Sequence, residues 1–90
     1  MSGRIGLSWF QYEDWPAWCA MDPEFQPDYH HWLRRMEDMI RELDARGIEA
    51  VKIPMDPAVF KAWADSCKQD YGTQARALFV TLRMQKMREH

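Results

Sequence analysis

Several residue patterns that identify enzymes and membrane proteins are missing from this sequence. Its 90 residues contain only four glycines, and none lies in a GxGxxG turn, a GxxxxGK(S/T) phosphate loop or a GxSxG nucleophile elbow. No apolar run approaches the roughly 20 residues of a membrane-spanning helix, and no basic segment followed by an apolar one begins the chain. We therefore expect a cytoplasmic protein with no glycine-rich phosphate site and no membrane partner.

Cysteine and histidine are too sparse to form a recognisable metal site. Cys19 and Cys67 fit no CxxC or Cys/His spacing, so we expect two reduced thiols, with Cys67 buried on a helix face. His30 and His31 are adjacent, and neighbouring residues of a helix point about 100° apart, which keeps both rings from reaching one ion. We expect no metal, no cofactor and no catalytic residue, and an enzymatic role is disfavoured.

Neither sign of charge is in large excess, but the charges are unevenly distributed. The net charge of −2 favours neither nucleic acid nor an anionic membrane as the default partner. Residues 1–28 carry one base and five acids, whereas residues 73–90 carry four bases and one acid. Because 47% of the residues are hydrophobic, we predict a single small globular domain over residues 1–90, with a basic tail over 84–90 that frays.

The clearest element is an amphipathic helix over residues 28–47. Asp28 is a suitable N-cap, and Gly47 can adopt the left-handed conformation that ends a helix. The charged residues of the outer face nearly balance, so this face is predicted to be solvated. The apolar residues recur every three or four positions and should cover a sheet: Tyr29, Trp32, Leu33, Met36, Ile40 and Leu43.

A strand and a short helix precede this element. Residues 4–12 alternate, which predicts a strand with Ile5, Leu7 and Trp9 on one face and Gly6, Ser8, Phe10 and Tyr12 on the other. If both faces are covered, we expect this strand to be central and not an exposed edge. Asp14 as a cap and a proline behind it predict a helix from Trp15 to about residue 21.

Another strand and two helices follow. Residues 48–56 alternate, and Pro54, which has no N–H, belongs at an edge or beyond the ladder. Asp56 then caps a helix that should run to about residue 68. Helical spacing favours a last helix from about Thr73, although residues 78–84 also fit a strand.

This order of elements predicts an α+β fold with a small two-stranded parallel sheet, β-α-α-β-α-α, packed by three to four helices. A two-stranded sheet is a poor platform on its own. Either the helices cover both of its faces, or dimerisation or another protein extends the sheet.

Two groups of residues are candidates for binding. The first is an aromatic cluster that either packs in the core or forms an exposed platform for a partner: Trp9, Tyr12, Trp15 and Trp18. The second is a basic set that either is a solvated helix end or contacts nucleic acid or a partner: Arg76, Arg83, Lys86 and Arg88.

The chain also resembles a family of small bacterial proteins of unknown function. The resemblance covers nearly the whole chain and implies a bacterial or phage cytoplasmic protein that stands alone as one domain. It implies no catalytic residue. It rests on Gly6-x-Ser8-Trp9-Phe10, Asp14-Trp15, Tyr29 to Trp32, Val51-x-Ile53-x-Met55-Asp56, Phe60-x-x-Trp63 and Ala75-Arg76-x-x-Phe79-Val80.

Our first functional hypothesis is a non-enzymatic protein-interaction module, a small regulatory or accessory protein that binds another protein or a second copy of itself. The alternative is nucleic-acid binding through the basic C-terminal helix. A third hypothesis is small-molecule binding or an enzymatic role around Trp9, Tyr12 and His30.

Overall fold

The computed structural model describes residues 3–88, and the side chains of residues 3–87. It confirms the α+β class, the two-stranded parallel sheet and the predicted order of elements. In chain order these are β1 (Arg4–Trp9), the 3-10 turn η1 (Tyr12–Asp14), α1 (Trp15–Met21), α2 (Tyr29–Ala45), β2 (Glu49–Pro54), α3 (Pro57–Ser66) and α4 (Thr73–Arg88).

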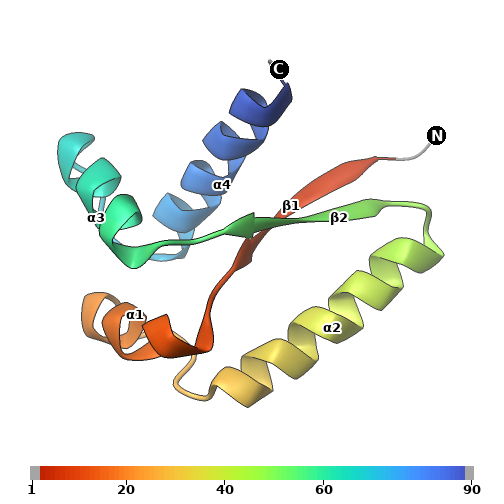
Figure 1. The fold of residues 1–90 in the computed structure, drawn as a ribbon, viewed down its shortest axis with the longest axis horizontal. Coiled ribbons are helices and arrows are strands. Elements are labelled where there is room, and N and C mark those ends of the chain that lie inside the picture. Colours follow the sequence, from red (N-terminus) through yellow and green to blue (C-terminus); the bar gives the residue numbers. More distant parts are fainter. Residues whose placement is uncertain (1–2, 89–90) are drawn as a thin grey trace.

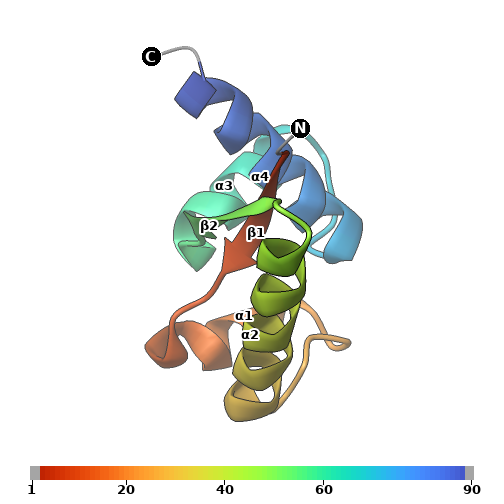
Figure 2. The ribbon, with the colours of Figure 1, turned by 90° about the vertical axis from the view of Figure 1, so that its right-hand side faces the viewer.

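The sheet is sandwiched between helices. The strands pair from Arg4 opposite Glu49 to Trp9 opposite Pro54. In Figures 1 and 2, α2 lies on one face of the strands, and α4 lies on the other. The molecule measures 38 × 33 × 19 Å, and Figure 1 looks down the shortest dimension. The protein is thin because each face of this narrow sheet is covered by little more than one helix.

The alternation of β1 places different residues against each layer. Trp9 faces α2, where its ring centroid lies 5.1 Å from that of Trp32. Gly6 faces α4, and a Cβ atom on it would lie only 2.8 Å from Val80 Cγ1 and from Met84 Cγ. Glycine is therefore needed here because α4 approaches the strand so closely.

The main core lies at the carboxyl end of the strands. Phe10 leaves β1 there and makes edge contacts with Trp18 and Phe25, at centroid distances of 4.9 and 5.0 Å. Trp18 and Phe60 are fully buried. The cluster contains residues from α1, α3, α4 and the strand ends: Phe10, Trp15, Trp18, Phe25, Ile53, Met55, Phe60, Ala64, Ala75, Phe79 and Val80.

The amino end of the sheet is less completely covered by α2. The six apolar residues predicted on the inner face of α2 are all half-buried, and no residue of this helix is buried. Ile5 on β1 remains 41% exposed, and Met39 on α2 remains 43% exposed. Helix α2 therefore shields the sheet only in part.

Two of the three predicted aspartate caps are confirmed. Asp28 Oδ1 accepts the N–H groups of His30 and His31, and Asp56 Oδ1 accepts those of Ala58 and Val59. Gly47, with φ of +74°, has the predicted left-handed conformation behind α2.

The prediction for Asp14 is wrong. Among the described residues, its side chain accepts no capping hydrogen bond, because η1 runs directly into α1 and leaves Asp14 in a right-handed helical conformation. Its pKa is raised by partial burial and by the nearby charges of Glu13 and Asp56.

Other boundaries also differ from the predictions. β1 ends at Trp9 because Tyr12 enters η1. α3 ends at Ser66, so Cys67 turns away from the buried stripe and is exposed, contrary to the prediction. Helix α4 is continuous from Thr73 to Arg88, so residues 78–84 are helical and not a strand. Within the part of the chain that is described, no helix has the length and apolar character needed to cross a membrane.

Candidate functional site

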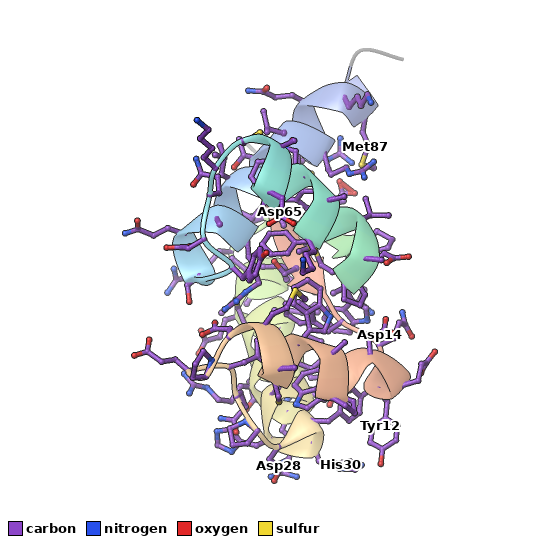
Figure 3. All side chains as sticks on the ribbon, turned by 90° about the vertical axis from the view of Figure 1, so that its left-hand side faces the viewer. Tyr12, Asp14, Asp28, His30, Asp65 and Met87 are labelled. Carbon is purple, nitrogen blue, oxygen red and sulfur yellow. The ribbon has the colours of Figure 1, made fainter. Side chains whose placement is uncertain are left out.

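The four candidate aromatic residues do not share one surface. Trp15 and Trp18 are buried in the core, with exposed fractions of 6% and 0%. Trp9 is half-buried between Trp32 and Lys52, whose Nζ lies 4.4 Å from the centre of its ring. Tyr12 is the exposed member of the set, at 62%, and it lies near His30 at the end of the molecule away from Met87 (Figure 3).

The indole groups of the two buried tryptophans differ in their hydrogen bonding. Trp15 Nε1 donates to the carbonyl of Gln26 at 2.8 Å. Trp18 Nε1 is buried and has no partner among the described residues. An unsatisfied donor of this kind costs roughly 1–3 kcal/mol, so the dense packing of the Trp18 ring must outweigh that cost.

A hollow of about 620 Å³ lies beside Tyr12 and His30. It also borders Cys19 and Asp28, but Asp28 already accepts two backbone N–H groups as the cap of α2. These bonds to the N–H groups of His31 and His30 lower the pKa of Asp28. No set of three metal-ligating side chains occurs in the described part of the chain.

The candidate basic residues are also separated. Arg76 is mostly buried, and its Nη1 donates to Asp22 Oδ2 and to the carbonyl of Tyr71, both at 2.8 Å. Burial alone would raise the pKa of Asp22, but the hydrogen bonds from Arg76 and from the N–H of Glu24 hold it below its ordinary value. Arg76 therefore fastens α4 to the end of α1.

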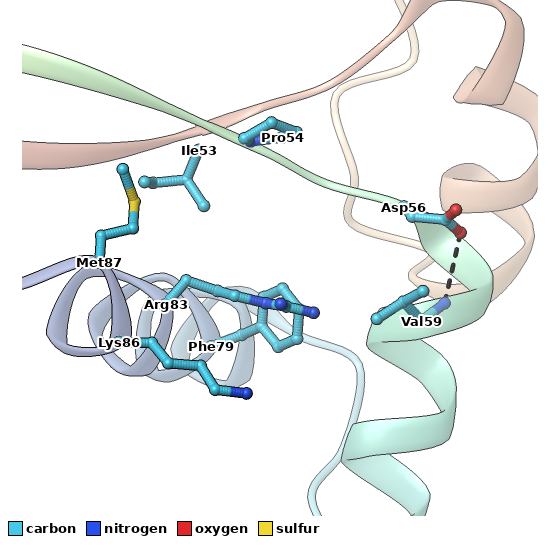
Figure 4. A pocket seen from close by; sticks show the side chains of 8 residues that line it. All are labelled: Ile53, Pro54, Asp56, Val59, Phe79, Arg83, Lys86 and Met87. Carbon is cyan, nitrogen blue, oxygen red and sulfur yellow. Dashed lines mark hydrogen bonds between the residues drawn. The ribbon is translucent and has the colours of Figure 1, made fainter. Parts of the chain in front are cut away.

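Arg83 and Lys86 lie on another side of α4. The guanidinium of Arg83 is 4.9 Å from the centre of the Phe79 ring. Together with Lys86 and Met87 it lines a hollow of about 400 Å³ next to Ile53 on β2 (Figure 4). The side chain of Arg88 lies outside those that are described. The structure thus brings Arg83 and Lys86 together but places Arg76 elsewhere.

The edges of the sheet hold polar groups that the sequence analysis did not identify. The N–H of Glu49 donates to the carbonyl of Gly3 at 2.8 Å, and the N–H of Met55 donates to that of Trp9 at 3.1 Å. Bonding residues alternate along a parallel ladder, and within the described residues β1 pairs only with β2. The N–H and C=O groups that point away from β2 therefore belong to Arg4, Gly6 and Ser8.

A groove of about 600 Å³ runs along this edge, and we call it the β1 groove. The edge of β1 forms its floor. One wall comes from α2 and is apolar. The other comes from α4 and mixes apolar residues with the polar residues Thr73, Arg76, Thr81 and Gln85. The walls include Trp32, Met36, Met39, Ala77, Val80 and Met84.

The two edges of the sheet are not equally accessible to another strand. On β2 the outward residues include Lys52 and Pro54, and Pro54 has no N–H to donate. Lysine and proline are common means of blocking an edge strand. On β1, by contrast, glycine and serine follow Arg4, so the edge of β1 is the better one for strand addition.

A strand pattern alone does not reveal which edge is open, because that depends on the pairing of distant residues. The alternation of residues 4–12 predicted the faces of β1 correctly. The apolar stripe of α2 included Trp32 and Met36 of the groove wall but not Met39, which lies outside the stripe in the sequence pattern.

No family model, curated protein or solved structure matches the chain. The resemblance to a small bacterial family stays a prediction, and the function has to be inferred from the geometry of the site.

Proposed function

We propose that the protein is a non-enzymatic interaction module that binds an extended strand of a polypeptide partner along the edge of β1. The observation that carries the proposal is the row of outward backbone groups on Arg4, Gly6 and Ser8, set between an apolar wall from α2 and a mixed apolar and polar wall from α4. Adding a strand to an open sheet edge is a common way to recognise a polypeptide. A bacterial, cytoplasmic setting is part of this proposal, in keeping with the two free thiols, Cys19 and Cys67.

Two kinds of interaction would stabilise such a complex. Each backbone hydrogen bond contributes a net of roughly 0.5–1.5 kcal/mol. Apolar side chains of the added strand would cover the exposed parts of Ile5, Met39 and their neighbours, at about 25 cal/mol per Å² of apolar surface removed from water. The hydrogen bonds would set the direction of the strand, and the walls would select its side chains.

A proline at position 8 tests this proposal. The N–H of Ser8 points away from β2, so Ser8→Pro removes a donor from the edge and no bond from the ladder. Ser8→Ala is the matched control, because it keeps the N–H. Circular dichroism should show the same fold for both variants.

The binding assay uses a library of displayed ten-residue peptides selected on the wild-type protein. We expect selected peptides to alternate apolar residues and to bind Ser8→Ala normally, whereas Ser8→Pro should weaken binding at least about tenfold, since it removes one hydrogen bond and adds a steric block. Equal binding to both variants, or no enriched peptide at all, would contradict the proposal.

A further inference from the structure

We infer that the hollow beside Arg83 and Lys86 binds a small organic carboxylate with a short apolar body. We call it the α3–α4 hollow, because both helices contribute to its lining. It is separate from the β1 groove, so this inference does not depend on the proposed function. It rests on the charges at the rim, on the apolar lining and on the small number of hydrogen-bond donors.

Helix α4 presents a mixed apolar and cationic stripe to this hollow. Phe79, Arg83, Lys86 and Met87 are spaced at i, i+4, i+7 and i+8, which places them on one face of the helix. The residues of α4 that line the β1 groove are different ones and lie on another flank. A ligand in the α3–α4 hollow can therefore contact apolar and cationic side chains of the same helix at once.

The two cations at the rim form no ion pair with the side chains of residues 3–87. The four ion pairs in that range involve other residues. The guanidinium of Arg83 lies over the ring of Phe79, 4.9 Å from its centre (Figure 4). Its planar array of N–H donors matches the two oxygens of a carboxylate. An anion at this rim would thus gain two cationic partners.

One acid also borders the hollow, but it has another role. Asp56 Oδ1 accepts the N–H groups of Ala58 and Val59, so this carboxylate caps α3. Two cations and one acid give the lining a formal charge of +1, whereas the whole chain has a net charge of −2. The hollow is therefore a local positive site on an acidic protein, and it favours anions over cations.

The rest of the lining is apolar and suits the body of a small molecule. Val59 on α3 and Met87 on α4 are 44% and 54% exposed, and Ile53 and Phe79 belong to the buried core behind them. The volume of about 400 Å³ falls in the range of small-molecule sites, roughly 300–1,000 Å³. An apolar body would cover Val59 and Met87, and the flexible methionine can adjust to its shape.

The supply of donors favours a carboxylate over a phosphate. The N–H groups of Ala58 and Val59 are already bonded to Asp56, and Pro54 has no N–H. Among the side chains that line the hollow, those of Arg83 and Lys86 carry the donors. One guanidinium can bind both oxygens of a carboxylate, whereas a phosphate group presents three acceptor oxygens and more charge. The hollow therefore fits the carboxylate better.

Titration with hydrocinnamate tests the site. This probe joins a carboxylate to a phenyl ring through a short chain, and hydrocinnamamide is its neutral counterpart. Binding is followed by the amide chemical shifts of the isotope-labelled full chain. We expect saturable shifts centred on Val59, Arg83 and Met87. The amide should bind at least about tenfold more weakly, because it forms no charge-assisted hydrogen bond.

Two results of this titration would overturn the inference. One is the absence of saturable shifts at about 10 mM hydrocinnamate, where even a millimolar ligand is mostly bound. The other is equal binding of the acid and the amide. A single-stranded oligonucleotide that binds in an Arg83-dependent way, when hydrocinnamate does not bind, would show that the cations contact phosphate groups and would likewise overturn it.

Substitutions separate a built site from a general attraction of anions. Arg83→Gln should weaken hydrocinnamate binding at least about tenfold, and Arg83→Lys should weaken it less, since lysine keeps the charge but not the planar donors. Arg34→Gln is the matched control, because Arg34 is exposed on α2, which covers the opposite face of the sheet (Figure 1). It should bind the probe as the wild type does. Equal effects of Arg83→Gln and Arg34→Gln would overturn the site.

Asp56→Asn tests the charge at the rim in the opposite direction. Asparagine is also a good N-cap, so the fold should be kept, as circular dichroism can check. Removing the negative charge should raise the affinity for hydrocinnamate roughly twofold or more, because the lining then carries both cations and no acid. An affinity that does not rise would overturn the placement of the carboxylate at this rim.

Discussion

Replacing Gly6 with alanine measures how closely α4 approaches the sheet. The added Cβ would lie 2.8 Å from both Val80 Cγ1 and Met84 Cγ, closer than ordinary carbon contacts of about 3.5–4.0 Å. The flexible side chain of Met84 can move aside by rotating, but the β-branched Val80 has little rotamer freedom. Part of α4 must therefore shift away from β1.

The expected magnitude follows from two opposing effects. Overpacking a core contact costs about 1–3 kcal/mol, whereas alanine in a strand interior gains roughly 0.5–1 kcal/mol over glycine. We expect Gly6→Ala to lower the free energy of unfolding by about 0.5–2 kcal/mol. A change of 1 kcal/mol corresponds to a fall of about 4–8 °C in Tm for a domain of this size.

The assay is thermal and urea unfolding followed by circular dichroism, at a concentration where light scattering gives the monomer mass. Gly3→Ala is the control, because nothing lies within 4 Å of a Cβ at that position. Adding Val80→Ala to Gly6→Ala should remove part of the clash, so the double variant should be more stable than the sum of the two single effects by at least about 0.5 kcal/mol. If Gly6→Ala were as stable as Gly3→Ala, the close packing of α4 on β1 would be refuted.

Three further predictions concern single contacts. Arg76→Ala should cost about 3–5 kcal/mol in urea unfolding, because it leaves the mostly buried Asp22 charge without its partner. Folding lowers the pKa of Asp22, so the ion pair contributes fully above the ordinary carboxyl pKa of about 3.9. The stability difference between wild type and Arg76→Ala should therefore shrink as the pH falls through the lower folded value. A stability difference that does not depend on pH would contradict this. Asp56→Ala should lower stability by about 0.5–2 kcal/mol through loss of the α3 cap, with Asp56→Asn as the conservative control in the same urea titration. Gly47→Ala should cost about 1–2 kcal/mol because its φ of +74° is unfavourable for alanine, and an unchanged Tm would count against that conformation.

The elements of this protein were predictable because their signals are local. The caps at Asp28 and Asp56 lie within three residues of the N–H groups that they bind. The alternation of residues 4–12 likewise requires only neighbouring positions, and it placed Gly6 on a face that something packs against closely.

The arrangement of the candidate residues was harder to predict because it depends on distant contacts. Arg76 and Asp22 are 54 positions apart, and nothing near either residue shows that they pair. The exposure of Cys67 depends on whether α3 continues for one more turn. Distant contacts also decide which residues of the aromatic cluster are buried, since the placement of α1 buries Trp18 and leaves Tyr12 exposed.

The position of the core has a consequence for the motions of the protein. Most of its buried aromatic rings lie at the carboxyl end of the strands, whereas the amino end is covered by the half-buried residues of α2. Local opening requires less free energy where fewer apolar contacts are lost. Amide hydrogens near Ile5 should therefore exchange through local fluctuations, while those near Ile53 should exchange only when the whole domain unfolds. The amino end of the sheet would thus be the part of the fold that can adjust to a partner without disturbing the rest.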